Sequence, residues 1–470
     1  MVDHQRAGYL ILSCAFLSLL LVSPQLARAQ AQSPFLGSVR TGQATGTTLE
    51  LPLKDALDRA LKYNLAIIEG SQNNRAAQAA RLQSLNALLP NLTARLGSVL
   101  EQVNLRAVGL NPNIPGIHIP TIIGPFGVAD ARAYLSQQVF NWSDIKNWKS
   151  AIESEKATQY TYKRDRDLVV QTTGDAYLLV ISDIANTDSI RARVETAQTL
   201  YRNAVDQNKQ GVIAGIDVLR AQVELQTEQQ RLISAENQLS IDKLVLARII
   251  GLPSGQEFRL ADSVPYAPLT DISLEESLEQ ARLNRADYLS AVAQVRAAEL
   301  ALRAAVAENY PSLSTDANYG DIGSPNFGTS HGTFSIAVGL NIPIFQGSRV
   351  RADKLRADSA LEQRKAELAD LGGRIDDEVR TAFFNFQSSS ELVTVARSNT
   401  DLANQTLTQA QDRFQAGVAD NLEVVQAQES VASANQSYIA SLYSFNASKL
   451  SLALALGVAE QSALQYLGVK

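Results

Sequence analysis

The chain is poor in the residues that bind soft metals and act as nucleophiles. Its 470 residues include one cysteine, one methionine and three histidines. The single cysteine, Cys14, cannot form an intramolecular disulfide or a thiolate metal site. His118 and His331 have no metal-ligand spacing, and so few histidines leave no nucleophile–base pair. We therefore expect no catalysis, no bound metal and no cofactor.

Excess charge and long apolar runs are also scarce. The net charge of −6 provides no basic surface for nucleic acid. The apolar run from Tyr9 to Val22 spans about 14 residues, fewer than the roughly 20 that a membrane-spanning helix needs. It precedes an A-x-A cleavage site at residues 27–29, so residues 1–29 are predicted to be a secretory signal peptide. Cys14 lies within this run, where the preceding residues fit a lipid-acceptor site poorly.

What the chain does contain is an internal duplication. With a shift of 221 residues (274 − 53), residues 53–93 align without a gap with residues 274–314. With a shift of 206 residues (417 − 211), residues 169–252 align with residues 375–458. The two shifts differ by 15 residues, which places extra sequence in the first copy between residues 94 and 140. A repeat of this length predicts one architecture built from two similar halves.

Each copy predicts long helices in the same order. The tract 144–210 contains no proline and would be roughly 100 Å long at 1.5 Å per residue, which suggests a coiled coil or the wall of a helical tube. Frequent alanines and few aromatic residues favour close packing of such helices. The predicted tracts are 53–88 with a break near Asn64, 144–210, 217–250, 274–308 with a break near Arg285, 348–416 and 422–456.

Between the first two helical tracts of each copy, the period changes to two. In the second copy, apolar residues alternate with small or polar ones over 313–320 and 334–342. The first copy predicts strands at about 92–104 and 129–136, joined by a proline-rich loop over 110–127. The alternation fits an outer-membrane barrel and a soluble sandwich alike, but four strands cannot close a barrel, so a barrel requires an oligomer. The aromatic residues where strand returns to helix fit an interfacial belt or simple packing at the joint: Phe140, Trp142, Trp148 and Phe345.

Two short turns join the long helices at the end far from the strands. Gly211 and Gly417 end the preceding helices, where a left-handed residue is favoured. Asp217, Asp420 and Asn421 can cap the next helix or place acidity in its first turn.

The second turn, with its flanking helices over 413–428, resembles the outer membrane efflux protein family, the trimeric TolC-like channels. The helix starts at 53–57 and 274–278, and the duplicated order of elements from about 50 to 457, resemble the family too. The resemblance implies an α+β membrane protein. In it, four strands per chain belong to a shared 12-stranded trimeric barrel, and long coiled-coil helices form a periplasmic tube.

The resemblance implies a passive exit duct in the cell outer membrane. Its expected partners are two further copies of the chain, a periplasmic adaptor, an inner-membrane pump reached through that adaptor, and outer membrane lipid. The expected division is a signal peptide (1–29), an N-terminal linker (30–52), a first repeat (53–252), an equatorial linker (253–273), a second repeat (274–458) and a tail (459–470). Hairpins are expected at about 91–140 and 312–343, and tips at about 210–217 and 416–423.

The resemblance also implies roles for residues at the tips. Gln426 is neutral where the family has a second carboxylate, so no double acidic ring is expected. Phe414 lacks a hydroxyl and Ala419 replaces an arginine, so apolar packing is expected in place of a hydrogen-bonded lock. The expected periplasmic gate consists of Asp217, Phe414, Glu423 and Gln426, and the expected adaptor-docking tip of Gly211, Val212, Gly417 and Val418. Helix-start acidity and turn chemistry explain the same residues without a functional role.

A different interpretation is a secreted trimeric coiled-coil adhesin or structural stalk. It accounts for the long helices and the signal peptide, but not for two hairpins that lead back into helices. A soluble periplasmic scaffold is a third interpretation, which requires that the strands do not face lipid.

Overall fold

The computed structural model describes residues 34–107, 109, 120–262, 266–267, 269, 273–323, 331–416, 418 and 421–468. The predicted signal peptide, most of the proline-rich loop and part of the second tip lie outside these residues. The chain divides into two compact units, each built from two separate stretches. One unit comprises Met1–Ala66 and Leu179–Asp262, and the other Ile67–Leu178 and Ser263–Lys470. The compact units therefore cut across the two sequence copies.

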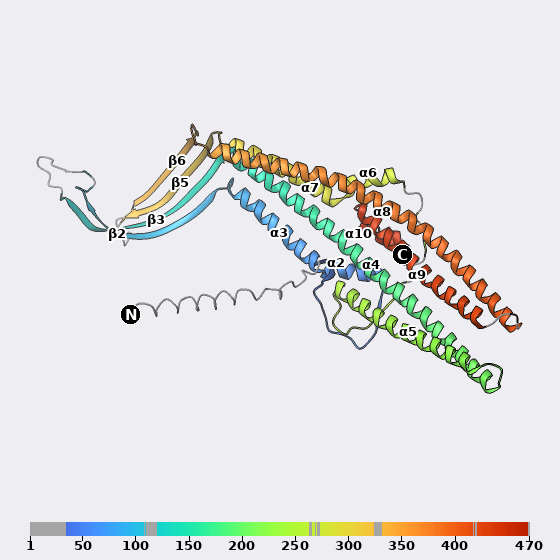
Figure 1. Cartoon of the computed structure of the whole chain (residues 1–470). Coiled ribbons are helices and arrows are strands. Elements are labelled where there is room, and N and C mark those ends of the chain that lie inside the picture. The colour runs from blue at the N-terminus through green and yellow to red at the C-terminus, as the bar shows by residue number, and fades with distance from the viewer. Residues whose placement is uncertain are drawn as a thin grey trace, which may run out of the picture. The chain divides into compact units, whose positions relative to one another are not determined.

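The helices of the two copies follow the same order, and most of them have matching residue bounds (Figure 1). Adding 221 to the bounds of the first two helices gives those of the corresponding pair in the second copy, and adding 206 to the last helix gives its counterpart. The first copy forms α2 (Leu53–Tyr63), α3 (Leu65–Asn86), α4 (Trp142–Lys209) and α5 (Gly215–Ile249). The second copy forms α6 (Leu274–Asn284), α7 (Ala286–Ala307), α8 (Arg349–Gln415) and α9 (Asn421–Ala455).

One residue with extended backbone interrupts the first helical tract of each copy. Asn64 has φ −65° and ψ 138°, and Arg285 has φ −62° and ψ 116°, so neither can continue a helix. The side-chain oxygen of Asn64 then accepts a hydrogen bond from the Ala66 amide at 3.0 Å and satisfies one free donor at the start of α3. Arg285 lies between two carboxylates, with nitrogen–oxygen distances of 2.6 Å to both Asp287 and Glu378. The two breaks therefore have the same backbone geometry and different side-chain chemistry.

The strands form one antiparallel sheet in the order β2-β3-β5-β6 (Figure 1). Their bounds are β2 Asn91–Asn104, β3 Ile122–Phe140, β5 Ser312–Gly323 and β6 His331–Asn341. The hairpin of the first copy thus lies beside the hairpin of the second through the pairing of β3 with β5. Within the described residues, β2 and β6 are the edges of this sheet.

The start of β3 differs from the prediction. The expected loop extended to Gly127, but β3 begins at Ile122 and includes Pro125. A proline has no amide to donate and is tolerated in a sheet at an irregularity. The pairing of β2 with β3 shifts register between Glu101 and Val103, close to this proline. The irregularity therefore lets the strand continue where a regular ladder would have ended.

Short elements lie where mixed structure was expected. In the first compact unit, β1 (Leu49–Leu51) pairs in parallel with β4 (Phe258–Leu260), and a 3₁₀ turn covers Pro34–Leu36. In the second unit, α10 (Ala459–Leu467) follows the last long helix. It is held on α4 by Arg166, whose guanidinium donates two hydrogen bonds, of 2.8 Å and 2.5 Å, to the carboxylate of Glu460.

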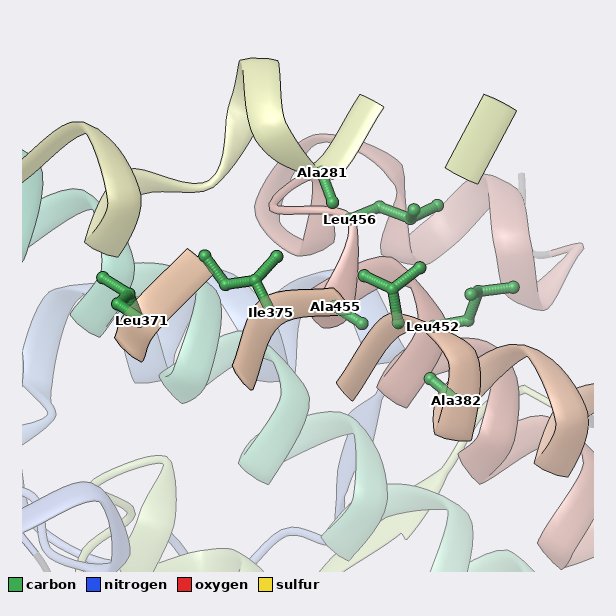
Figure 2. Packing of buried hydrophobic residues seen from close by; sticks show 8 residues of the cluster. Ala281, Leu371, Ile375, Ala382, Leu452, Ala455 and Leu456 are labelled. Carbon is green, nitrogen blue, oxygen red and sulfur yellow. The ribbon is translucent and has the colours of Figure 1, made fainter. Parts of the chain in front are cut away.

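The core of the second unit is an apolar stripe between helices (Figure 2). Its α8 members recur every three to four residues, which places them on one face of the helix. Ala281 of α6, and two leucines and one alanine at the end of α9, lie opposite them, so this contact uses large as well as small side chains. The cluster comprises Ala281, Leu371, Ile375, Val379, Ala382, Leu452, Ala455 and Leu456.

Candidate functional site

The sheet has one apolar face that none of the described residues covers. Register places Leu96 of β2, Ala131 of β3 and Tyr319 of β5 on the same side as alternate residues of β6. The side chains on β6 are strongly exposed: Phe334 72%, Ile336 70%, Val338 66% and Leu340 63%. A continuous exposed apolar surface of this kind marks contact with a membrane or with another protein.

The opposite face of the sheet is polar and partly charged. The guanidinium of Arg132 donates to both oxygens of Asp130, at 2.7 Å and 2.5 Å, within β3. Arg95 of β2 lies over the ring of Tyr134, 5.0 Å from its centroid. The two faces therefore differ in polarity, as a wall between lipid and water requires.

Aromatic residues gather where the strands meet the helices. The rings of Phe140 and Trp142 pack edge to face with centroids 5.3 Å apart. With Tyr310 and Leu340, they line a shallow groove of about 390 Å³ beside Pro311. Phe345 is 87% exposed, whereas Trp148 is half-buried on α4. Phe140 and Trp142 thus pack together at the joint while remaining partly exposed. This arrangement is compatible both with an interfacial belt and with simple packing at the joint.

The first tip is a tight turn with a repeated hydrogen-bond pattern. Gly211 has φ +77°, its amide donates to the carbonyl of Asn208 at 2.9 Å, and the Val212 amide donates to that of Gln207 at 2.9 Å. This is the pattern of a helix that ends on a left-handed glycine. Val212 is 68% exposed.

Asp217 lies in the first turn of α5 and does not cap it. The N-cap position is Ala214, which provides no side-chain hydrogen bond. The carboxylate of Asp217 pairs instead with Arg220 at 3.3 Å. Its negative charge is also stabilised by the positive end of the helix dipole at the start of α5.

The second tip shares the pattern where the structure describes it. The Val418 amide donates to the carbonyl of Arg413 at 3.0 Å, the counterpart of the Val212 bond, and Val418 is 71% exposed. Glu423, near the start of α9, lies 3.4 Å from the guanidinium of Arg413 and is partly exposed. Gln426 is exposed on the same helix. Gly417 and the side chain of Phe414 lie outside the described residues, and Asp217 and Glu423 belong to different compact units.

The helices also contain buried ionisable groups that the sequence analysis did not identify. In the first unit, burial, and next a hydrogen bond to Asp242, raise the pKa of Asp183 to about 7. In the second unit, burial raises the pKa of Asp175 to about 7 and lowers that of Lys449 to about 8. Lys449 is fully buried, and its Nζ atom lies 4.6 Å from the centre of the Phe445 ring. The sequence does carry a signal for Lys449, because it is a charged residue within an apolar stretch of helix. Lys243 occupies the equivalent position in the first copy.

The long helices α4 and α8 have different contacts at one pair of equivalent positions. Arg166 on α4 is bound by Glu460 of α10, as described above, and Asp167 accepts the Glu460 amide at 2.9 Å. Their counterparts on α8 are Gly372 and Gly373, and a side-chain carbon built at either position meets no atom within 4 Å. A groove of about 340 Å³ lies there, lined in part by Tyr288 and Asp376.

Two observations on the described residues concern metal binding and membrane-spanning helices. No group of three or more histidine, cysteine, aspartate or glutamate side chains there could hold a metal ion. One helix there, α4, is long and apolar enough by composition to cross a membrane. Within this helix Val169, Val170 and Tyr177 are buried by other parts of the chain, and 39% of its most apolar 18-residue stretch is buried.

Comparisons with known proteins agree with this geometry. The family model described as "Outer membrane efflux protein" matches residues 56–252 and 277–458. The chain is 24% identical over 400 residues to the pyoverdine export outer membrane protein OpmQ of Pseudomonas aeruginosa, covering 82% of this chain and 81% of that protein. It is 23% identical over 353 residues to the outer membrane protein TolC of Escherichia coli, covering 71% and 70%. The crystal structure of the Campylobacter jejuni CmeC outer membrane channel superposes with a TM-score of 0.74 at 16% identity, covering 91% of this chain and 92% of that one.

Proposed function

Because the chain belongs to the outer membrane efflux protein family, we propose that three copies form a passive exit duct through the outer membrane. In this duct the four strands of each chain contribute to a 12-stranded barrel, and the helices form a tube in the periplasm. Energy for transport comes from an inner-membrane pump, which is coupled to the duct by a periplasmic adaptor. No step of this function requires catalysis or a cofactor.

The observation that carries the proposal is the two-faced sheet with open edges. One face presents Ile336, Val338 and their neighbours to the outside, and the other presents Arg95, Asp130 and Arg132. In lipid, the unpaired backbone groups at the edge strands β2 and β6 would be very costly. Pairing β6 of one chain with β2 of the next satisfies them, and three sheets of four strands close at twelve.

The helical part of the proposal follows from the matched helix bounds. A broken helix, a long helix and a further helix recur in each copy, so three chains supply six similar sets of helices. We assign residues 53–252 and 274–458 to the two repeats, with the linker 253–273 and the elements around β1, β4 and α10 in the equatorial region.

The tips are proposed to perform two tasks. Two exposed apolar residues would dock the helical hairpins of the adaptor: Val212, which follows the left-handed Gly211, and Val418, which follows Gly417 in the sequence. Asp217, Phe414, Glu423 and Gln426 would form the periplasmic gate. Three-fold symmetry would place three Glu423 carboxylates around the mouth, and Arg413 would neutralise part of their charge.

The decisive experiment combines membrane fractionation with recordings in planar bilayers. The full chain is expressed, fractionated and purified in detergent, and its mass is determined. We expect it in the outer membrane fraction, as a trimer that conducts ions. A soluble periplasmic protein that forms no conducting trimer would overturn the proposal and favour the scaffold.

The adhesin or stalk interpretation explains the sheet less well. A stalk needs no sheet with one apolar and one charged face, and the family match covers both repeats. It predicts a trimer with no conductance, so the same recording separates the two.

A further inference from the structure

The groove at the strand–helix joint opens from the apolar face of the sheet. We call it the joint groove; it has a volume of about 390 Å³ and is lined in part by Phe140, Trp142, Tyr310, Leu313 and Leu340. Register sets Phe140 opposite Leu313 and Leu313 opposite Leu340, so one row across three strands provides its apolar wall. Leu340 lies on the same face of β6 as Ile336 and Val338. The joint groove therefore continues the exposed apolar face to the helical end of the sheet.

Two large aromatic side chains with a polar edge border the joint groove. Trp142 is 41% exposed and Tyr310 is 50% exposed. Tryptophan and tyrosine with one apolar and one wet end are typical of the level where the hydrocarbon of a membrane meets its headgroups. The joint groove is therefore placed where a lipid has its acyl chain on one side and its headgroup on the other.

A lysine lies on the helical side of the joint groove. The Nζ atom of Lys146, one turn further along α4, is 5.4 Å from the centre of the Trp142 ring, and the side chain is half-buried. Two carboxylates of this region are engaged elsewhere. Asp144 lines a separate groove between α3 and α4, and Glu308 lies 3.4 Å from Arg349. The ammonium group of Lys146 thus borders an apolar groove and is available to pair with an anion.

The second copy has neither the ring nor the lysine. A shift of 206 places Ser348 and Ala352 at the positions of Trp142 and Lys146 (142 and 146 + 206). A strand can thus return to a long helix without these two side chains, so the joint itself does not require them. The combination of aromatic edge and ammonium group occurs once per chain at these positions.

We propose that the joint groove binds one acyl chain of an anionic phospholipid from the periplasmic leaflet, whose phosphate pairs with Lys146. The acyl chain matches the row of Phe140, Leu313 and Leu340, and the phosphate matches the ammonium group at the end of the groove. A protein segment is a poorer occupant, because its backbone polar groups would be left unsatisfied against the lipid-facing sheet. This inference rests on the proposed duct and adds one lipid site per chain.

Tryptophan fluorescence tests the site, because the chain has two tryptophans, Trp142 and Trp148. In the full chain with Trp148→Phe, Trp142 is the single emitter. The purified trimer is reconstituted in phosphatidylcholine vesicles that contain a small fraction of phosphatidylglycerol with brominated acyl chains, or the same fraction of brominated phosphatidylcholine. Bromine quenches the emission of an indole that it contacts.

Two lysine variants complete the design. Lys146→Ala copies the second repeat. The matched control, Lys156→Ala, removes a lysine ten residues further along the same helix (156 − 146), which is about 15 Å away.

We expect brominated phosphatidylglycerol to quench Trp142 about two- to fivefold more strongly than brominated phosphatidylcholine, as one partly exposed ion pair would give. Lys146→Ala should abolish this preference, and Lys156→Ala should retain it. A second measurement keeps both tryptophans: native mass spectrometry should detect bound phosphatidylglycerol on the parent trimer, up to one molecule per chain, and less on Lys146→Ala.

Bilayer conductance is measured on the same samples. A conducting trimer that both lipids quench equally contacts only bulk lipid at Trp142, and a conducting trimer that neither quenches has its joint groove covered by protein. Either result overturns the lipid site and leaves the duct standing, as does an equal loss of preference in Lys156→Ala. A soluble protein that forms no conducting trimer overturns both.

Discussion

The carboxyl group of Asp242 on α5 lies close enough to that of Asp183 on α4 to raise its pKa. At the equivalent positions of the second copy, the hydroxyls of Ser389 and Ser448 lie 2.8 Å apart. One copy therefore has an acid pair where the other has a neutral hydroxyl pair. Two carboxylates that share a site cannot both ionise without repulsion, and burial adds to this effect.

This acid pair should make stability depend on pH. The pKa of Asp183 rises from 3.8 to about 7 on folding, so its contribution to stability is fully present below about pH 4 and is lost as pH rises to 7. We expect Asp183→Ser with Asp242→Ser, which copies the second repeat, to stabilise the protein at pH 8 by about 1–2 kcal/mol, after allowance for partial exposure. Thermal unfolding between pH 4 and 8 checks this, and an unchanged pH profile would contradict it.

Lys449 should destabilise the fold at neutral pH. Its Nζ atom is buried without a hydrogen-bond partner among the described residues, and its pKa falls to about 8. The stability contributed by its neutral form is therefore present at high pH and is lost as pH falls from about 10.5 to 8. We expect Lys449→Met to stabilise the protein at pH 7 by about 2 kcal/mol, since it keeps the length of the side chain.

The matched control for this change is Lys243→Met. Lys243 occupies the equivalent position in the first copy but is half-buried. It should shift the unfolding midpoint much less. Destabilisation by Lys449→Met would show that the ammonium group has a partner in the assembled protein.

The proposed gate predicts an electrical effect without a stability effect. Glu423→Gln removes the 3.4 Å pairing with Arg413, and because both groups are solvated the change should cost less than about 0.5 kcal/mol. In planar bilayers we expect altered conductance and weaker block by divalent cations. Glu429→Gln, on the exposed surface of the same helix, should leave both unchanged. If the Glu423 variant conducts and is blocked like the parent, the residue is not part of the gate.

Gly457 should be intolerant of any side chain. Its φ of +72° is unfavourable for other residues, and an added Cβ would lie 2.8 Å from the backbone of Arg285. We expect Gly457→Ala to destabilise the fold by at least about 2 kcal/mol. Gly347, with φ +61° and open space around it, is the matched control, and its alanine variant should lose only about 1 kcal/mol. Equal unfolding midpoints for the two variants would refute the role of close packing.

The barrel predicts that adjacent residues of β6 tolerate charge very differently. Ile336 lies on the apolar face and Ser335 on the polar face. Arginine at a lipid-facing position costs about 2–4 kcal/mol near the bilayer centre. We therefore expect Ile336→Arg to reduce the yield of folded trimer in membranes strongly and Ser335→Arg to preserve it. Similar yields from the two variants would argue that the sheet does not face lipid.

The helices were predictable because their signals are local. The periodicity, the absence of proline and the terminal glycines placed the ends of α5 and α9 within two residues, and the breaks fell at Asn64 and Arg285. The strand alternation also predicted which face of β6 is apolar. These features depend on neighbours in the sequence, and the repeat allowed each one to be read twice.

The remaining features depend on contacts between distant segments. The extension of β3 through Pro125 depends on an irregularity opposite it in β2. The acid pair of Asp183 and Asp242 joins two helices, and no local pattern distinguishes these aspartates from solvated ones. Helix α10 lies on α4 because Glu460 meets Arg166, which are far apart in the chain. The twelve-stranded closure, the gate and the adaptor surface remain predictions for the experiments above.

The glycine pair on α8 makes the two long helices differ in the contacts that hold them at one level. At one level α4 is braced by α10 through Arg166 and Asp167, whereas α8 has Gly372 and Gly373, with no side chains there to brace. Each glycine also loosens a helix by roughly 1 kcal/mol relative to alanine. In the proposed trimer, three salt-bridged positions on α4 would alternate with three glycine pairs on α8. At this level α8 is held by the apolar packing of Leu371 and Ile375 with α6 and α9, so the same height of the proposed tube would rest on ion pairs in three helices and on apolar contacts in the other three.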